Sequence, residues 1–250
     1  MRQGLIWAFF AIRLSNATEL QVAAAADLAQ VQPAIGAAFA RKSGVTIRWI
    51  TGSSGVLAKQ AENGAPFDVF LSASESFVND LVAHDVALRE TAVVYATGRL
   101  GLWSLSPGLV QELGDLLKPR VLHVAIANPA HAPYGTAAKE ALESRGLWKS
   151  IEAKLVYGEN VRQALQFAES GNADAVLTAW ALVKSKPGAV EVPPAGTYKP
   201  LRQAGVVLRG SQEKKSAREF LRFLLSPDTQ KLFRDAGFGA VDYGSSGISK

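Results

Sequence analysis

Short apolar segments alternate with helix-like segments along most of this 250-residue chain. The helix-like character is clear after segment 68–71, where Phe77, Val78, Leu81 and Val82 stand at helical spacing. Parallel strands need a long crossover, usually a helix, so regular alternation of this kind predicts α/β architecture. The expected strands are 20–26, 45–50, 68–71, 100–103, 121–127, 175–178 and 206–208. The main expected helices are 27–42, 56–63, 77–82, 137–145, 161–169, 217–225 and 228–236. We therefore predict an α/β fold with mainly parallel sheets flanked by helices.

The chain is long enough to form two lobes, each with its own core. The expected crossings lie near residues 98–100 and near Gly205. On this division the first lobe consists of residues 18–99 and 206–250, and the second lobe consists of residues 100–205. The first lobe is then built from both ends of the chain.

Composition excludes several classes of protein. There is no cysteine, which excludes disulfides, iron–sulfur clusters, thiolate zinc sites, a cysteine nucleophile and a lipid-modified N-terminal cysteine. His84, His123 and His131 are scattered, without metal-ligand spacing. No stretch approaches the roughly 20 apolar residues of a spanning helix, so a multi-span membrane protein is excluded. The net charge of +5 comes without a basic run, and nucleic-acid binding is not indicated.

The first 17 residues have the features of an export signal. Arg2 precedes the apolar segment 5–12, and small residues at 15–17 match the positions that a signal peptidase reads. Arg13 interrupts this pattern, and the alternative is a buried or frayed N-terminal helix. Removal of Arg2 and Arg13 with residues 1–17 would lower the net charge from +5 to +3, because no acidic residue lies there.

Four helix starts that directly follow strands are the most informative local feature. They are 26–28, 51–55, 128–136 and 159–162. Ligands of α/β sheets bind at the carboxyl ends of strands, and the unpaired N–H groups of a helix start favour an anion. Each start alone is also compatible with an ordinary cap or turn. Two starts in each lobe make two facing walls of N–H donors conceivable.

Local residues give each start a specific expectation. Asp27 and Asn160 are good N-caps, and Thr136 can cap the helix over 137–145. Pro133 and Gly135 are expected to hold Tyr134 in a turn before that helix. Pro33 conflicts with a regular helix beginning at Asp27, so either that turn is irregular or the helix starts nearer Val31.

Signals of catalysis are weak. The sequence has no Gly-Lys-Ser/Thr phosphate loop, no G-x-G-x-x-G and no G-x-S-x-G turn. An enzyme would have to use Asp27, Asp68 or Glu159 as a general base, and no nucleophile or paired base accompanies them.

In order along the chain, these motifs resemble the periplasmic molybdate-binding proteins, the ModA-type solute-binding components of ABC importers. The matching segments are 22–28, 52–55, 63–73, 132–135, 138–142, 159–161 and 226–227. The string Gly-Ala-Pro-Phe-Asp-Val-Phe-Leu-Ser-Ala at 64–73 and the Glu-Asn-Val step at 159–161 are fairly specific in combination. The similarity extends from about Leu20 to about Phe238.

The resemblance implies a two-lobed periplasmic-binding-protein fold of type II that closes on a tetrahedral oxyanion in the interlobe cleft. Neutral N–H and O–H donors would hold the oxygens, with no protein atom on the molybdenum itself. Carried over by position, the ligand-binding residues would be Ala26, Asp27, Ser54, Tyr134 and Val161.

Two positions depart from the family pattern. Some members use a tyrosine hydroxyl where this chain has Ala179, and Tyr134 is a possible replacement donor. Members often have serine or asparagine where this chain has Asp27, and a carboxylate repels an anion. We therefore expect Asp27 to contribute its backbone N–H and to turn its side chain away as a cap. If the carboxylate points inward, it can accept the proton of hydrogen phosphate, and phosphate becomes the better ligand.

The function expected from the resemblance is capture of molybdate or tungstate in the periplasm and delivery to a membrane ABC permease. The protein would be a soluble monomer after signal cleavage, would need no cofactor and would not be an enzyme. The alternative is a protein of the same fold that binds phosphate, sulfate or another small anion.

Overall fold

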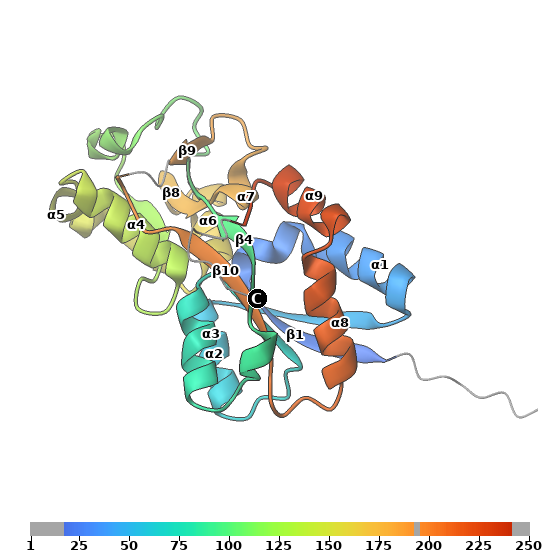
Figure 1. Ribbon diagram of the computed structural model, residues 1–250. Coiled ribbons are helices and arrows are strands. Elements are labelled where there is room, and N and C mark those ends of the chain that lie inside the picture. The colour runs from blue at the N-terminus through green and yellow to red at the C-terminus, as the bar shows by residue number, and fades with distance from the viewer. Residues whose placement is uncertain (1–17, 193–195, 242–250) are drawn as a thin grey trace, which may run out of the picture.

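Two five-stranded sheets, one in each lobe, organise the chain in the computed structural model, which describes residues 18–192 and 196–241 (Figure 1). The predicted export signal, residues 1–17, lies outside the described residues. None of the helices in the described part of the chain is long and apolar enough to cross a membrane.

The first lobe holds the sheet with strand order β2-β1-β3-β10-β4. Its strands are β1 (Glu19–Ala25), β2 (Thr46–Gly52), β3 (Val69–Ser72), β4 (Val93–Gly98) and β10 (Leu201–Val207). Its helices are η1 (Ala26–Gln30), α1 (Gln32–Ser43), α2 (Ser54–Glu62), α3 (Glu75–Ala83), η2 (Arg89–Thr91), α8 (Lys214–Leu224) and α9 (Pro227–Ala236), where η marks a 3-10 helix. Strands β2, β1 and β3 are parallel, and β10 runs antiparallel to both β3 and β4.

The second lobe holds the sheet with strand order β7-β6-β8-β5-β9. Its strands are β5 (Leu100–Trp103), β6 (Val124–Ala127), β7 (Leu155–Gly158), β8 (Ala175–Ala179) and β9 (Val190–Val192). Its helices are η3 (Leu113–Leu117), α4 (Pro133–Ser144), α5 (Trp148–Ile151), η4 (Glu152–Lys154), α6 (Val161–Glu169) and α7 (Trp180–Val183). Strands β7, β6 and β8 are parallel, and β5 runs antiparallel to β8 and β9. Each sheet is therefore mixed, with a single strand against the common direction.

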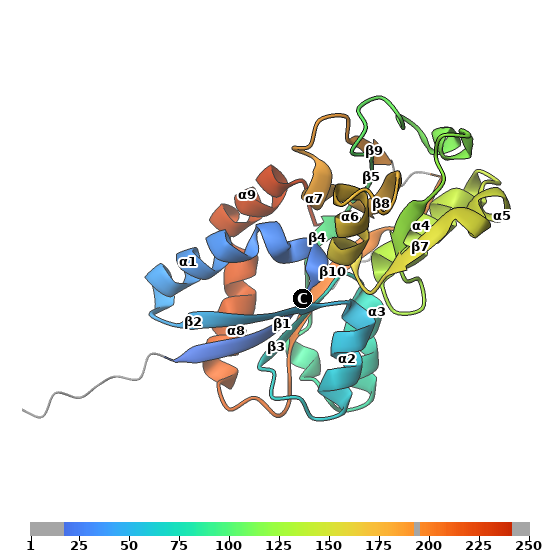
Figure 2. The same ribbon diagram turned by 180° about the vertical axis from the view of Figure 1, so that it is seen from behind.

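Apolar side chains of the helices cover both faces of the first sheet. On one face Phe39 of α1 packs edge-on against Phe220 of α8, with ring centroids 5.0 Å apart. On the other face Leu57 of α2 and Leu81 of α3 are buried against the sheet. Figure 2 shows α1 and α8 on the opposite side of the strands from α2 and α3. Because both faces are covered, only the ends of the strands remain for a ligand.

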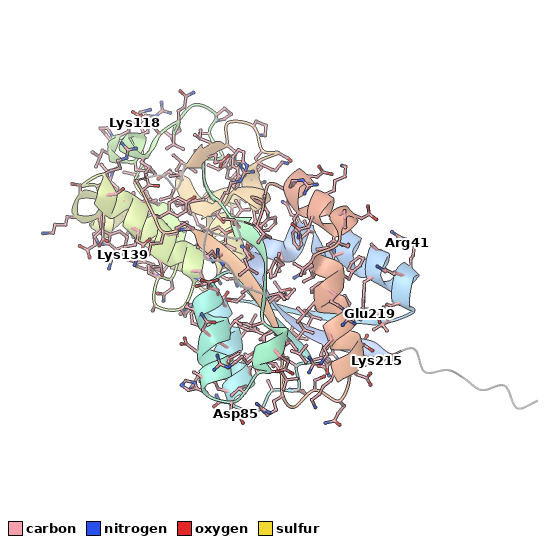
Figure 3. All side chains as sticks on the ribbon, viewed as in Figure 1. Arg41, Asp85, Lys118, Lys139, Lys215 and Glu219 are labelled. Carbon is pink, nitrogen blue, oxygen red and sulfur yellow. The ribbon has the colours of Figure 1, made fainter. Side chains whose placement is uncertain are left out.

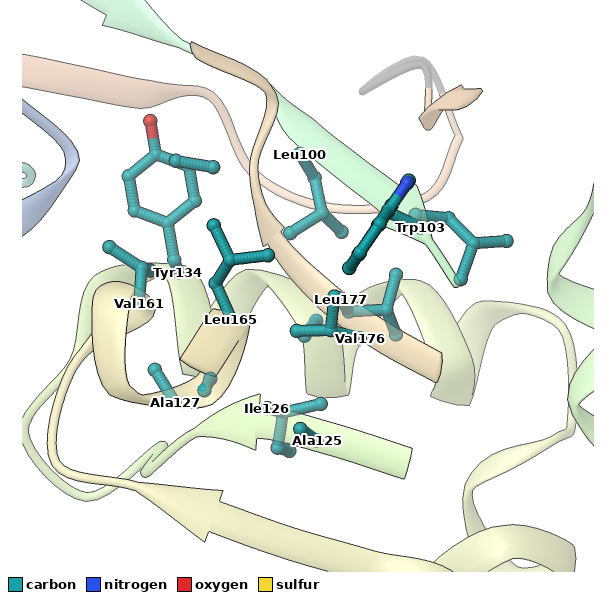
Figure 4. Packing of buried hydrophobic residues seen from close by; sticks show 14 of the residues in the cluster. Leu100, Trp103, Ala125, Ile126, Ala127, Tyr134, Val161, Leu165, Val176 and Leu177 are labelled. Atoms are coloured by element: carbon teal, nitrogen blue, oxygen red, sulfur yellow. The ribbon is translucent and has the colours of Figure 1, made fainter. Parts of the chain in front are cut away.

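The second lobe has one continuous core beneath α4 and α6 (Figure 4). Leu100, Ile126 and Leu177 are almost completely inaccessible to solvent within it. The figure also shows Tyr134 and Val161 at the border of this core. The packing therefore fixes the first turns of α4 and α6 relative to the second sheet.

The chain crosses between the lobes at Arg99, as predicted, and again before β10. The second crossing was predicted near Gly205, with the first lobe resuming at residue 206, but it lies several residues earlier, because β10 begins at Leu201 and belongs to the first sheet. The error has a physical cause: Arg202 and Gln203 break the apolar pattern of this strand, although Gln203 is completely buried.

The conflict raised by Pro33 is resolved in both of the expected ways. A 3-10 helix, η1, follows β1 directly, and the regular helix α1 then begins at Gln32 with Val31 as its N-cap. Pro33 thus falls in the first turn of α1, where its missing N–H costs no hydrogen bond.

Candidate functional site

The four predicted helix starts meet at one small hollow between the lobes. The first lobe lines it with the starts of η1 and α2, and the second lobe lines it with the starts of α4 and α6. The lining residues are Ala25, Ala26, Asp27, Gly52, Ser53, Ser54, Ala73, Ala132, Pro133, Tyr134, Asn160 and Val161. All five residues proposed from the sequence, Ala26, Asp27, Ser54, Tyr134 and Val161, belong to this lining. Their binding role itself stays a prediction.

Ser54 offers two donors to the hollow from the first turn of α2. Its Oγ accepts a hydrogen bond from the N–H of Ala73 at 3.0 Å, which leaves the hydroxyl hydrogen available. Its own N–H has no backbone acceptor among the described residues, as expected for a helix start. Ser54 is therefore oriented as a donor before any ligand is considered.

The second lobe contributes the backbone N–H groups of Tyr134 and Val161. Neither group has a backbone acceptor in the described chain. Asn160 caps α6 as predicted, since its Oδ1 accepts from the N–H of Arg162 at 2.9 Å and of Gln163 at 3.2 Å. The cap satisfies the second and third N–H of the helix and leaves the first, that of Val161 in the lining of the hollow, without a backbone acceptor among the described residues.

Two predictions for α4 are wrong. This helix begins at Pro133, so Tyr134 lies inside its first turn and not in a turn before it. Thr136 does not cap the helix, because its hydroxyl donates to the carbonyl oxygen of Pro129 at 3.1 Å. Proline at the first helical position explains the early start, since its fixed φ suits a helix and its absent N–H would be unpaired there.

Asp27 does not cap a helix, contrary to prediction. Ala25 occupies the N-cap position of η1 and no side chain caps that helix. The Asp27 carboxyl is instead buried, and its Oδ2 accepts a hydrogen bond from Nε2 of Gln203 on β10. Its Oδ1 has no hydrogen-bond partner in the described structure. Burial raises the pKa of this carboxyl from 3.8 to about 6, against the opposing effects of hydrogen bonds from Gln203 and Tyr134.

Tyr134 joins the two lobes through its side chain. Its hydroxyl bonds to the Asp27 carboxyl and also accepts from Nε2 of Gln203 at 3.3 Å. Oε1 of Gln203 in turn accepts from the hydroxyl of Tyr95 at 3.0 Å. All four side chains are buried, and sequence reasoning missed Gln203 and Tyr95.

A second set of interlobe hydrogen bonds lies at the rim of the hollow. His131, before α4, accepts at its carbonyl oxygen from the N–H of Gly55 at 2.9 Å and from Oγ of Ser53 at 2.7 Å. The ring Nδ1 of His131 also lies 2.8 Å from Oγ of Ser53. These contacts bring the start of α2 against the opposite lobe, so the structure represents a closed arrangement of the lobes.

Charge is almost absent from the hollow. No lysine or arginine contributes to its described lining, and its only ionisable side chains are those of Asp27 and Tyr134. Figure 3 labels charged side chains such as Arg41, Lys118 and Lys139 at the periphery of the lobes. The arrangement therefore presents neutral donors, interrupted by a single buried carboxyl group.

The other residues considered from the sequence lie apart from this donor set. Both oxygens of Asp68 are bonded, one to the N–H of Gln21 and one to Oγ of Ser211. The Glu159 side chain is 69% exposed and lies 3.7 Å from Nε2 of His131. Ala179, at the end of β8, is buried and has no hydroxyl to offer. Among the described residues no three His, Cys, Asp or Glu side chains gather as a metal site would require.

Comparison with known proteins gives consistent similarities. The family described as bacterial extracellular solute-binding protein matches residues 20–239. The molybdate-binding protein ModA of Rhodobacter capsulatus is 38% identical over 223 residues, which cover 89% of this chain and 88% of that protein. ModA of Azotobacter vinelandii is 34% identical over 230 residues, or 90% of this chain and 91% of that protein.

Solved structures agree with the sequence relatives. The periplasmic molybdate-binding protein of Azotobacter vinelandii superposes with a TM-score of 0.85 at 32% identity, covering 89% of this chain and all of that one. The sulfate-binding protein SubI of Mycobacterium tuberculosis, at 18% identity and a TM-score of 0.71, shares the fold over 90% of this chain and 88% of that one.

Proposed function

We propose that this chain, which belongs to the bacterial extracellular solute-binding protein family, captures molybdate outside the cytoplasm and delivers it to an ABC permease. It is a transport protein and not an enzyme, in keeping with relatives that are named as binding proteins. Molybdate is the cargo, and the proposal needs no cofactor.

The observation that carries this proposal is the convergence of four helix starts on one hollow. The N–H groups of Ala26, Ser54, Tyr134 and Val161 have no backbone acceptor in the described chain and come from both lobes. A fully deprotonated tetrahedral oxyanion only accepts hydrogen bonds, so it matches a set of donors directed from several sides. Each charge-assisted hydrogen bond contributes roughly 1.5–3 kcal/mol, so a few suffice without a cationic side chain.

Closure of the lobes is the proposed means of capture. Donors of the first lobe bind the anion first, and donors of the second lobe reach it only when the cleft closes. The anion then favours the closed state through its better contacts there. The closed protein would dock to the permease.

Further parts of the proposal follow from the family and the sequence. Tungstate has the same shape and charge as molybdate and is expected to bind to the same donors. Residues 1–17 are proposed to direct export and to be removed, leaving a monomer in the periplasm. The two relatives described above, which match about nine-tenths of this chain, are molybdate-binding proteins, and this favours molybdate over phosphate or sulfate.

A thermal-shift panel followed by calorimetric titration tests this proposal. The protein from Thr18 onward is heated with molybdate, tungstate, sulfate or phosphate. A ligand at 1,000 times its Kd stabilises the native state by about 4 kcal/mol. For a chain of this size that corresponds to a rise in Tm on the order of 10 °C. We expect the rise with molybdate and tungstate, whereas a rise with phosphate alone would refute the proposal.

A further inference from the structure

We propose that binding of molybdate takes up one proton, and that this proton sits on Oδ1 of Asp27, which then donates to an oxygen of the anion. The inference rests on the proposed function and deepens it, because it assigns to Asp27 a part in deciding which anions are bound and at which pH.

The hydrogen bonding of Asp27 is the geometric basis. Its Oδ2 is occupied by Nε2 of Gln203, and the carboxyl also bonds to the hydroxyl of Tyr134. Its Oδ1 is the one buried side-chain oxygen or nitrogen without a hydrogen-bond partner in the described part of the chain. Buried polar groups are nearly always paired, so this atom calls for a partner that the protein does not supply. Asp27 belongs to the lining of the hollow, where that partner is expected to be the ligand.

The chemistry of the hollow decides the form of this contact. Ser54, Tyr134 and Val161 add N–H donors to the lining, and its described residues include no lysine or arginine. A carboxylate beside a doubly charged anion would be two like charges without a counter-ion in a buried place. A protonated carboxyl removes the repulsion and adds one more donor, while its Oδ2 keeps the bond from Gln203.

In the part of the chain that the structure describes, the neighbours of Asp27 offer no other group to take the proton or to cancel its charge. The titratable groups that act on it electrostatically are Tyr134 from α4 and Tyr95 from β4. Burial, and then the charge of Asp27, raises the pKa of both tyrosines well above 10, so both stay neutral. Helix α7 (Trp180–Val183), which packs on η1, has no titratable residue, and Arg162 at the start of α6 is exposed.

The remaining elements packed on η1 are equally neutral toward this carboxyl. From α1, Gln32 bonds through Nε2 to Oγ1 of Thr51 on β2. The end of β1 contributes only alanines. On β10, Arg202 pairs with Glu75 at 2.7 Å and does not compensate Asp27. The proton must therefore come from solvent or with the ligand.

The pKa of Asp27 in the unliganded protein determines how strongly the affinity for molybdate depends on pH. Burial raises it to about 6, and an adjacent dianion raises it further by repulsion. At pH 6 about half of the free protein carries the proton and at pH 8 only about 1% does, so the affinity for a proton-free dianion falls about 50-fold between pH 6 and pH 8. Hydrogen phosphate would bring its own proton and would bind with no uptake from solvent.

Calorimetric titration with molybdate at pH 6, 7 and 8, each in two buffers of different ionisation enthalpy, tests the inference. For the wild-type protein at pH 8 we expect uptake of one proton per molybdate, and a Kd that rises about fivefold from pH 6 to pH 7 and about tenfold from pH 7 to pH 8. For Asp27→Asn we expect no proton uptake, a Kd independent of pH, and binding at pH 8 about 100-fold tighter than wild type. Glu159→Gln removes an exposed carboxylate near the rim and is expected to behave as wild type.

Failure of this inference is distinguishable from failure of the proposed function. Tight molybdate binding by the wild type without proton uptake at pH 8 would overturn the role of Asp27 and leave molybdate capture standing. This result needs no variant, so it decides the matter even if Asp27→Asn does not fold. A wild-type protein that binds no molybdate at pH 6 would refute the proposed function and, with it, the proton uptake.

Discussion

Substitution of Gly55 by alanine tests whether closure of the lobes is part of ligand binding. Gly55 lies in the first turn of α2, and a Cβ atom placed on it would lie 2.7 Å from the carbonyl oxygen of His131. The same atom would lie 3.0 Å from Cβ and 3.1 Å from Cα of His131. Because Gly55 and His131 belong to opposite lobes, the clash exists only when the cleft is closed.

The expected change in the Kd for molybdate follows from these distances. Real Cβ atoms essentially never approach another atom within 3.0 Å, so the lobes must separate by a few tenths of an ångström at this contact. Overpacking of this kind costs about 1–3 kcal/mol, which raises the Kd for molybdate roughly 5- to 150-fold. In the open form the extra methyl group is free, and alanine favours a helix over glycine by up to about 1 kcal/mol. The unliganded protein is therefore expected to be as stable as wild type or slightly more stable.

Calorimetric titration and thermal unfolding of the same sample measure these two effects. Gly210→Ala is the matched control, since a Cβ at Gly210 would meet no atom within 4 Å, and it should leave the Kd unchanged. Weaker binding together with an unchanged or raised Tm of the unliganded protein supports the reasoning. If Gly55→Ala binds molybdate as tightly as wild type, the closed arrangement of the lobes is not the state that holds the anion.

Three further expectations concern the residues of the hollow. Ser54→Ala removes a hydroxyl donor worth about 1.5–3 kcal/mol, so calorimetry should show a Kd about 10- to 150-fold higher. Ser144→Ala, which removes a hydroxyl bonded within its own helix, should show no change. Tyr134→Phe keeps the backbone N–H, so its Kd at pH 6 should change less than tenfold, and a larger loss would make the hydroxyl itself a ligand donor. Without ligand, the raised pKa of Asp27 means that the native state binds the proton more tightly than the unfolded chain. Lowering the pH through 6 toward 3.8 should therefore stabilise the wild type by up to about 3 kcal/mol relative to Asp27→Asn, and an equal difference in denaturation free energy at pH 7 and pH 4 would contradict this.

The sequence predicted the elements that carry strong local signals. Residues 161–169 form a helix at the expected bounds, because Asn160 caps it and its apolar residues follow the helical period. Strands β4, β7 and β9 were not predicted. Strand β7 has only four residues at an edge of its sheet, which is too short to show a strand period although three of them are apolar. The short helices α5 and α7 are single turns, too short to show a period.

The site could be predicted as far as it depends on helix starts. Ser54, Tyr134 and Val161 each follow a strand and a short turn, and the sheet topology alone brings such positions together. The surroundings of Asp27 could not be predicted in this way. Its partner Gln203 is 176 residues away, and nothing local distinguishes a buried glutamine from an exposed one. Tyr95, whose hydroxyl orients Gln203, was missed as well, because it lies on β4 and that strand was not predicted.

The central claim is tested most directly by a crystal structure of the protein from Thr18 onward. The crystals are grown with molybdate, and the molybdenum atom is located by its anomalous signal. The account predicts one molybdenum atom between the starts of η1, α2, α4 and α6. Its oxygens should accept hydrogen bonds from Ser54 and from the backbone N–H groups of Tyr134 and Val161. A molybdenum atom bound elsewhere, or held by lysine or arginine side chains, would contradict it.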